Sequence, residues 1–249
     1  MGDWKDNIHF VLVEPREAGN IGASARAMKN MGFKKLCLVR PAALTDETRW
    51  LAHNSLDVLD RAAVYDTLSG ALADKSLVVG VARRAGKRRG MSLPLRKGVQ
   101  RLREAAHGNR VALLFGREDR GLYNEETDEC GFLLTIPASR EHPSLNLSHA
   151  VMVVAYELSQ AGQGEGAAPG TQQRKAKRER FVGHGELECL FERMTRALVL
   201  LDYMPHGDRD LQKHIMENLK HFIGRAGLTD WELKMLHGLC SQIERKVGG

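Results

Sequence analysis

The sequence predicts an α/β protein in which helices flank a parallel sheet, followed by a small all-helical extension. Short apolar runs rich in Val, Leu and Ile alternate with helical patterns over the first 160 residues. Such runs are typical of parallel strands that are buried on both faces. A stretch rich in Gly, Ala and Gln, "AGQGEGAAPGTQQ" (161–173), then interrupts the alternation, and only helical periodicity remains beyond it.

The apolar runs and helical patterns give the order of the expected elements. Strands are expected at 8–13, 35–39, 76–82, 110–115 and 132–136. Helices are expected at 20–31, about 47–59, 67–74, 94–106, 124–129 and 146–160. This alternation favours a parallel sheet, because parallel strands need long crossover connections that helices supply.

The Gly/Ala/Gln-rich stretch divides the chain into two parts. Residues 161–173 are expected to form a flexible linker, since they contain no bulky apolar side chain that could enter a core. The boundaries are therefore a domain at 1–160 and an extension at 174–249.

Three amphipathic helices are expected in the extension. The segments 185–204 and 210–226 both place apolar residues at helical spacing. The last helix is expected to begin at Thr229 and Glu232, which have the spacing of a capping box. Helices of this kind need a surface to pack on for stability.

Composition and termini are those of an ordinary globular protein. Of the 249 residues, 43% are hydrophobic and 27% are charged, which is usual for this class. No stretch approaches the roughly 20 apolar residues of a membrane helix, and the N-terminus lacks the regions of a secretory signal. The four cysteines are scattered without a C-x-x-C pair, which argues against a disulfide framework or a zinc site. We therefore expect a cytoplasmic protein that binds no membrane and requires no metal.

Positive charge is concentrated in two segments of a chain whose formal net charge is +6. Residues 83–103 contain nine Lys or Arg and no acid, and "RKAKRER" forms a second cluster at 174–180. Because like charges repel, such runs favour a polyanionic partner, above all a nucleic acid. A solvated face that keeps the protein soluble is the alternative.

The segment "PREAGNIGASARAMKNMG" (15–32) follows the first expected strand, and a strand, a glycine-rich turn and a helix are typical of nucleotide sites. The dinucleotide fingerprint is G-x-G-x-x-G, with an acid near the end of the second strand. Here Gly19 and Gly22 have the spacing G-x-x-G, and the second strand ends at Arg40. Arg40 could meet an NADP phosphate, so a nicotinamide-dependent enzyme stays an alternative.

The helix after this turn places Arg26 in the middle of its polar face, opposite Ile21 and Ala25. A solvated surface arginine is one interpretation. A guanidinium directed at a phosphate, with help from the helix N-terminus, is the other.

Two later segments also place small and polar residues where strands end. "LLFGREDRGLYNEE" (113–126) contains Gly116, Glu118 and Gly121, and "TIPASREHPSLNLSHAV" (135–151) leads into a helix. Open α/β sheets bind ligands at such strand ends. Together with "GNIGASARAMKNMG", these segments resemble the three motifs of the SPOUT superfamily of RNA 2′-O-methyltransferases. Within it, the chain is most similar to bacterial tRNA methyltransferases that act on nucleotide 32 of the anticodon loop.

The resemblance covers residues 7–160 strongly and the extension more loosely, and it implies a fold and a cofactor. The fold would contain a C-terminal trefoil knot, in which the last strand, loop and helix are threaded through an earlier loop. The enzyme would be a homodimer that binds S-adenosyl-L-methionine in the knot. Carried over by position, the cofactor site would comprise Val81, Ala82, Arg83, Gly116, Glu118, Ile136, Pro143, Ser144 and Leu145.

The resemblance also implies roles in the reaction, which is attack of a ribose 2′-hydroxyl on a sulfonium methyl group. Arg26 and Ser144 would be the catalytic residues. A guanidinium stays protonated at neutral pH, which favours Arg26 as a clamp on the neighbouring phosphate over a general base. The residues expected to contact RNA are Asn20, Arg26, Arg84, Lys87, Arg88 and Arg89. Gly19 and Gly22 are expected to let their helix approach RNA and the partner subunit.

Some alternatives stay open at this point. Ser144 and Asn146 could simply cap the following helix. The substrate could be ribosomal RNA or another position of tRNA, since Pro143 and the loop after Val81 and Ala82 depart from the family pattern. A noncatalytic RNA-binding protein with the same fold is a further alternative, although Arg26 and Glu118 are both retained.

Overall fold

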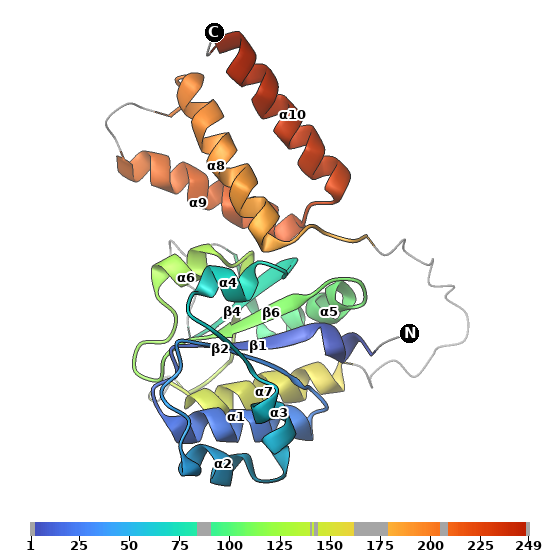
Figure 1. The fold of residues 1–249 in the computed structure, drawn as a ribbon, viewed down its shortest axis with the longest axis vertical. Coiled ribbons are helices and arrows are strands. Elements are labelled where there is room, and N and C mark those ends of the chain that lie inside the picture. Colours follow the sequence, from blue (N-terminus) through green and yellow to red (C-terminus); the bar gives the residue numbers. More distant parts are fainter. Residues whose placement is uncertain are drawn as a thin grey trace, which may run out of the picture.

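The computed structural model describes residues 3–83, 91–139, 141, 144–161, 179–204 and 209–247. At its centre lies a seven-stranded sheet in the order β3-β2-β1-β6-β4-β7-β5 (Figure 1). The strands are β1 (Ile8–Val13), β2 (Lys35–Val39), β3 (Ala63–Tyr65), β4 (Leu77–Ala82), β5 (Ser92–Pro94), β6 (Val111–Phe115) and β7 (Phe132–Thr135). All neighbouring strands are parallel, so the predicted parallel sheet is confirmed.

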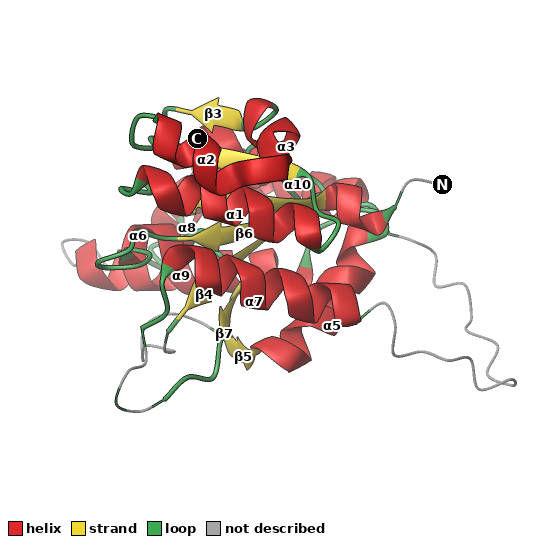
Figure 2. Cartoon of the chain, turned by 90° about the horizontal axis from the view of Figure 1, so that it is seen from below, coloured by secondary structure: helices red, strands yellow, loops and turns green. Residues whose placement is uncertain are grey.

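The five predicted strands correspond to β1, β2, β4, β6 and β7. The sequence did not indicate β3 and β5, which have three residues each and form the two edges of the sheet (Figure 2). The helix expected at about 47–59 is divided into two α-helices with a short 3-10 helix between them, and the first ends where the backbone at His53 has a positive φ of 48°. No helix within the described part of the chain is long and apolar enough to cross a membrane.

Helices cover both faces of the sheet (Figure 1). The face with the larger apolar cluster carries α1 (Ala18–Asn30), α2 (Asp46–Ala52), η2 (His53–Ser55), α3 (Leu56–Asp60), α5 (Leu95–Ala106) and α7 (Leu147–Gln160). The opposite face carries α4 (Leu68–Leu72) and α6 (Asn124–Asp128), and a short helix η1 (Trp4–Asn7) precedes β1.

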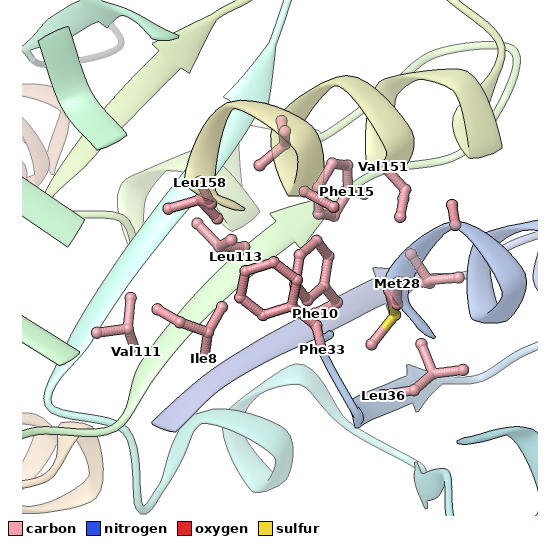
Figure 3. Packing of buried hydrophobic residues seen from close by; sticks show 14 of the residues in the cluster. Ile8, Phe10, Met28, Phe33, Leu36, Val111, Leu113, Phe115, Val151 and Leu158 are labelled. Atoms are coloured by element: carbon pink, nitrogen blue, oxygen red, sulfur yellow. The ribbon is translucent and has the colours of Figure 1, made fainter. Parts of the chain in front are cut away.

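The core gathers where the two central strands meet α1 and α7 (Figure 3). The rings of Phe10 on β1 and Phe115 on β6 are stacked, with their centroids 5.8 Å apart, and Phe33 approaches Phe10 at 5.3 Å. All five residues of β6 are buried, as the continuous apolar run predicts. This core fixes the central strands. Because these strands are parallel, their carboxyl ends lie side by side, and we call the line of these ends the carboxyl edge of the sheet.

Gly19 and Gly22 do not lie on the exposed surface that was expected to approach RNA and a partner subunit. Both are buried, and Gly22 lies against α2 of the same chain. A Cβ on Gly22 would be 2.0 Å from the carbonyl oxygen of Thr48. The prediction that these glycines approach RNA or a partner subunit is therefore wrong. Gly22 allows α1 to pack directly on the backbone of α2, and Gly19 leaves room for the side chains of Glu47 and Leu51.

The extension consists of three helices, α8 (His184–Leu200), α9 (Arg209–Ala226) and α10 (Asp230–Val247). The capping box before α10 is confirmed, since the Thr229 amide donates to the Glu232 carboxylate over 2.8 Å and the Glu232 amide donates back to the Thr229 hydroxyl. These helices enclose their own apolar cluster. Of the predicted linker at 161–173, only Ala161 lies within the described residues.

The extension packs on the face of the sheet that carries α4 and α6 (Figure 1). A docking cluster of Glu129, His184 and Lys220 joins the two parts: one Glu129 oxygen lies 2.9 Å from His184 Nε2, and the other accepts from Lys220 Nζ over 3.0 Å. Nearby, Gly131 touches the backbone of Gly224. A Cβ on Gly131 would lie 2.4 Å from the Gly224 carbonyl oxygen. Glu188 lies close enough to Glu129 and His184 to share a cation, but the contacts of Glu129 already satisfy both of its oxygens.

Replacing Glu129 by Gln is expected to weaken this attachment in a pH-dependent manner. Burial alone would raise the pKa of Glu129, but the contacts with His184 and Lys220 outweigh burial and lower the pKa from 4.5 to about 2. The ionised carboxylate thus stabilises the folded protein at pH values above its unfolded pKa, by roughly 3 kcal/mol. This contribution is lost as the pH falls from 4.5 toward 2.

Thermal unfolding of the wild type and Glu129→Gln as a function of pH measures this effect. The variant should have the lower Tm at neutral pH, and the difference should shrink below about pH 4. The matched control is Asp57→Asn, which removes the exposed ion pair with Lys29 and should change Tm little. A Tm difference that does not depend on pH would contradict the assignment.

Candidate functional site

A pocket of about 310 Å³ opens at the carboxyl edge of the sheet, a volume at the lower end of the range for small-molecule sites, about 300–1,000 Å³. Most of its walls come from the ends of β4, β6 and β7 and the beginning of α7. The predicted cofactor residues that line it are Val81, Ala82, Arg83, Gly116, Glu118, Ile136, Ser144 and Leu145. Pro143 lies outside the described residues.

These residues come from distant parts of the sequence, and the sheet brings them together. β4 lies between β6 and β7, and the carboxyl ends of parallel strands meet at the same edge of a sheet, where α/β proteins bind ligands. The residues that follow each strand therefore surround one space. The walls combine apolar residues, such as Ile136 and Leu145, with the glycines and the charged residues of the loop that follows β6.

The loop after β6 forms a tight turn at the pocket wall. Arg117 and Gly121 exchange two backbone hydrogen bonds, of 3.2 and 2.8 Å. Gly121 has a φ of +69°, a conformation that glycine adopts without strain. A Cβ on Gly116 would lie 2.0 Å from the carbonyl carbon of Gly121. Both glycines are thus required by the shape of this loop, which we call the β6 loop (116–122).

Glu118 of the β6 loop holds the beginning of α1. Its carboxylate accepts hydrogen bonds from the backbone amides of Arg16 and Glu17, over 3.0 and 3.2 Å, and from the side-chain amide of Asn20 over 3.0 Å. Burial would raise the pKa of Glu118, but these hydrogen bonds outweigh it and lower the pKa below its ordinary value. Glu118 is therefore ionised at neutral pH and connects α1 to the pocket.

Asn20 and Asn146 continue this connection to α7. The side-chain amide of Asn146 donates to the Asn20 side-chain oxygen over 2.9 Å. The Asn146 oxygen in turn accepts from the backbone amide of Ser148 over 2.9 Å and caps α7. The expectation that Asn20 contacts RNA does not fit this environment, because the residue is only 8% exposed and its side-chain polar atoms are bonded to Glu118 and Asn146. Asn20 supports the site from beneath.

The two candidate catalytic residues occupy different environments. Ser144 lies two residues before the cap of α7 and lines the pocket, so the helix-capping alternative holds for Asn146 and not for Ser144. Arg26 is exposed on α1, six residues beyond Asn20, which is roughly 9 Å along the helix. The four other residues predicted to contact RNA, Arg84, Lys87, Arg88 and Arg89, lie outside the described residues.

The sequence gives no sign of the role of Arg117, a residue of the β6 loop whose side chain is buried. Its guanidinium contacts both oxygens of Glu126, over 2.9 and 3.0 Å, and one oxygen of Glu14 over 2.7 Å. It also lies over the ring of Tyr123, 4.0 Å from the centroid. Arg117 is part of the second motif, but a charged residue in a loop is normally solvated, and no pattern in the sequence indicates its burial.

The geometry also argues against the dinucleotide alternative. Gly19 and Gly22 lie against α2, so they do not form a phosphate loop. The guanidinium of Arg40 is paired with the Glu14 carboxylate and donates to the Asp66 carbonyl oxygen. The pocket lies beside β4, β6 and β7, away from the end of β2.

Comparison with known proteins agrees with this geometry. The model of the SpoU rRNA methylase family matches residues 7–156. The tRNA (cytidine/uridine/adenosine-2′-O-)-methyltransferase TrmJ of Pseudomonas aeruginosa is 35% identical, over 98% of this chain and 96% of its own length. The tRNA (cytidine/uridine-2′-O-)-methyltransferase TrmJ of Yersinia pestis is 37% identical, over 96% and 92%.

Among solved structures, TrmJ from Z. mobilis superposes with a TM-score of 0.78 at 26% identity, covering 95% of this chain and 98% of that one. The similarity to all three proteins therefore includes the extension as well as the domain that contains the pocket. The family match includes the β6 loop and most of α7, the two elements that carry Glu118 and the capping Asn146. The chain therefore belongs to the SpoU rRNA methylase family.

Proposed function

We propose that the protein methylates the ribose 2′-hydroxyl of nucleotide 32, a cytidine or uridine in the tRNA anticodon loop. The observation that carries the proposal is the pocket at the carboxyl edge of the sheet, which eight of the cofactor residues expected from the resemblance line together. The protein is a methyltransferase, and S-adenosylmethionine is its methyl donor. tRNA as substrate is supported by the names of the relatives, and nucleotide 32 follows from the motif resemblance.

The residues of the pocket fit this donor. The close contact of Gly116 with Gly121 leaves backbone groups of the β6 loop at the pocket wall, where a larger residue would displace them. Backbone amides and carbonyls can bind the edge of an adenine, while Ile136 and Leu145 offer apolar surface. When bound, S-adenosylmethionine supplies an electrophilic methyl group on sulfur.

Arg26 and Ser144 are proposed to act on the RNA. The 2′-hydroxyl is a poor nucleophile and must be aligned with the bond between the methyl group and the sulfur, which breaks as the new carbon–oxygen bond forms. Alignment of this kind contributes roughly 7–11 kcal/mol in favourable cases. We assign Arg26 to the phosphate beside the target ribose, because a guanidinium binds phosphate with two parallel hydrogen bonds. Ser144, at the pocket, accepts a hydrogen bond from the hydroxyl.

Other polar residues of the site hold Arg26 and Ser144 in place. Glu118 fixes the N-terminus of α1, the helix that carries Arg26, and Asn146 fixes the N-terminus of α7 next to Ser144. Asn20 connects the two through its side-chain amide and oxygen. The proposed function therefore depends on a continuous chain of hydrogen bonds from the β6 loop through Asn20 of α1 to the cap of α7.

We also propose that the enzyme is a cytoplasmic homodimer with a trefoil knot. The knot is supported by the path of the chain, since β7 lies between β4 and β5 whereas α7 packs on α1. The dimer is supported by α7, where Val151 and Val154 are buried but Tyr156, a large apolar residue, is 50% exposed. RNA as partner is supported by the basic run at 83–103.

Methyl transfer from labelled S-adenosylmethionine to unmodified tRNA tests the proposal. Label is expected on the ribose of nucleotide 32, and Arg26→Ala is expected to lower the rate about 100-fold, the usual effect of misplacing a reacting group. Arg61→Ala removes another exposed arginine and should leave the rate within twofold.

The other outcomes separate the alternatives. Label at another tRNA nucleotide, or in ribosomal RNA only, would retain the chemistry and refute the proposed target. Binding of tRNA without transfer to any RNA would instead indicate the noncatalytic protein. An Arg26→Ala variant as fast as the wild type would contradict the role of the guanidinium.

A further inference from the structure

Arg117 is the charged residue of the β6 loop that is buried. Only 4% of its surface is exposed, whereas Asp119 and Arg120, in the same β6 loop, are exposed. A buried arginine is rare unless carboxylates pair with it. The position of Arg117 between Gly116 and Glu118, both at the pocket wall, makes its environment relevant to the site.

Two carboxylates and a ring surround the guanidinium. Glu126 on α6 forms a bidentate pair with it, over 2.9 and 3.0 Å. Glu14, at the end of β1, accepts from Nε over 2.7 Å, and the ring of Tyr123 lies 4.0 Å from the guanidinium carbon. Burial alone would lower the pKa of Arg117, but the two carboxylates outweigh burial and raise it. Lysine could not reproduce this set of contacts, because it lacks the planar fork.

The ionic contacts continue to the end of β2. Glu14 also accepts from Arg40 Nε over 2.8 Å. Glu14 and Arg40 have positive φ angles of 48° and 43°, and non-glycine residues in this region cost of order 1–3 kcal/mol and persist only where the surroundings hold them. The carboxyl ends of β1 and β2, the β6 loop and α6 are thus joined by one series of ion pairs.

This series fixes the wall of the pocket. The backbone of Arg117 makes both hydrogen bonds that close the turn with Gly121, and residues 116–122 all line the pocket. A displacement of the Arg117 side chain would therefore move backbone groups at the pocket wall. Neither Arg117 nor its three partners is among the residues assigned above to the cofactor or the RNA.

We propose that Arg117 is a positioning residue for the cofactor pocket: its guanidinium, held by Glu14, Glu126 and Tyr123, sets the place of the β6 loop and so the affinity for S-adenosylmethionine. This inference rests on the proposed function, because it takes S-adenosylmethionine as the ligand of the pocket. Arg117 acts through the loop backbone and takes no part in the reaction with RNA.

The test compares Arg117→Lys with the wild type by calorimetric titration of S-adenosylmethionine and by steady-state kinetics. The lysine keeps the positive charge but loses the fork, so the Kd and the KM for S-adenosylmethionine should rise about tenfold, the loss of roughly one charge-assisted hydrogen bond. The kcat at saturating cofactor and the Kd for tRNA should stay within twofold. A general loss of structure would not produce this division between KM and kcat.

Two further variants keep the test decisive. Arg117→Met with Glu126→Gln removes the pair without leaving Glu126 ionised and unpaired, and it should weaken cofactor binding at least as much as Arg117→Lys. Arg193→Lys is the matched control, because Arg193 contacts both oxygens of Glu244 in the extension; its affinity for S-adenosylmethionine should equal that of the wild type.

Each outcome decides a different question. Wild-type affinity in both Arg117 variants would overturn the positioning role and leave the proposed function intact. Equal losses in tRNA affinity, kcat and cofactor affinity would overturn it too, because they would show a merely structural role. A wild-type protein that binds no S-adenosylmethionine would refute the proposed function, and the present inference with it.

Discussion

The Gly22→Ala variant is expected to lose on the order of 3 kcal/mol of unfolding free energy, the upper end of the usual cost of overpacking. The new Cβ would lie 2.0 Å from the carbonyl oxygen of Thr48 and 3.0 Å from the amide nitrogen of Ala52. It would therefore meet the backbone of α2, which cannot rotate away as a side chain can. Thermal unfolding followed by circular dichroism measures the effect, expected as a Tm lower by roughly 6–12 °C.

Gly238→Ala is the matched control for this variant. Gly238 lies inside α10, and a Cβ there would have nothing within 4 Å. Since alanine favours a helix over glycine, this substitution should stabilise the protein by about 0.5–1 kcal/mol. A Gly22→Ala protein that unfolds at or above the wild-type temperature would show that α1 and α2 do not pack as closely as described.

The sheet could be predicted from the sequence because its central strands are buried on both faces. A continuous apolar run such as Val111–Phe115, between two helical patterns, indicates a buried parallel strand. The edge strands β3 and β5 have only three residues each, too few to show a period. The break at His53 depends on a positive φ, and a histidine in a helical pattern does not indicate one.

The role of Gly22 shows a second limit of sequence patterns. Periodicity assigns a residue to a face of its own helix, but it does not identify the element that covers that face. The expectation that Gly22 helps its helix to approach RNA or a partner subunit assumed that this glycine is exposed. In the structure, α2 covers the glycine with its backbone, and a backbone contact leaves no apolar side chain in the sequence to indicate it.

The part of the candidate site that lies in loops directly after the strands could be predicted from the sequence. β4, β6 and β7 are parallel neighbours, so the loops after them had to meet, and the motif resemblance selected the residues. The side-chain partners could not be predicted. Asn20 and Asn146 are 126 positions apart in the sequence, and Arg117 reaches Glu14 across a separation of 103. Such pairs form only when distant segments pack together, and no local pattern in the sequence indicates them.

The Gly116→Ala variant is expected to bind S-adenosylmethionine about 10- to 100-fold more weakly, the effect of an overpacking cost of roughly 1.4–2.7 kcal/mol on a binding loop. The Cβ would lie 2.0 Å from the carbonyl carbon of Gly121 and 2.2 Å from the amide nitrogen of Leu122. The two backbone hydrogen bonds between Arg117 and Gly121 must then open, and the pocket wall moves. Calorimetric titration of the purified variant at a temperature below its Tm measures the loss.

A comparison with Gly121→Ala distinguishes a steric clash from backbone strain as the cause of weaker cofactor binding. A Cβ on Gly121 meets nothing within 4 Å, but the φ of +69° strains any other residue. That strain costs roughly 1 kcal/mol, about fivefold in affinity if the loop relaxes to relieve it. Gly116→Ala should therefore be the more damaging of the two. If the order were reversed, the β6 loop would be held by the conformation of Gly121 alone, and the close contact with Gly116 would have no part in shaping the pocket.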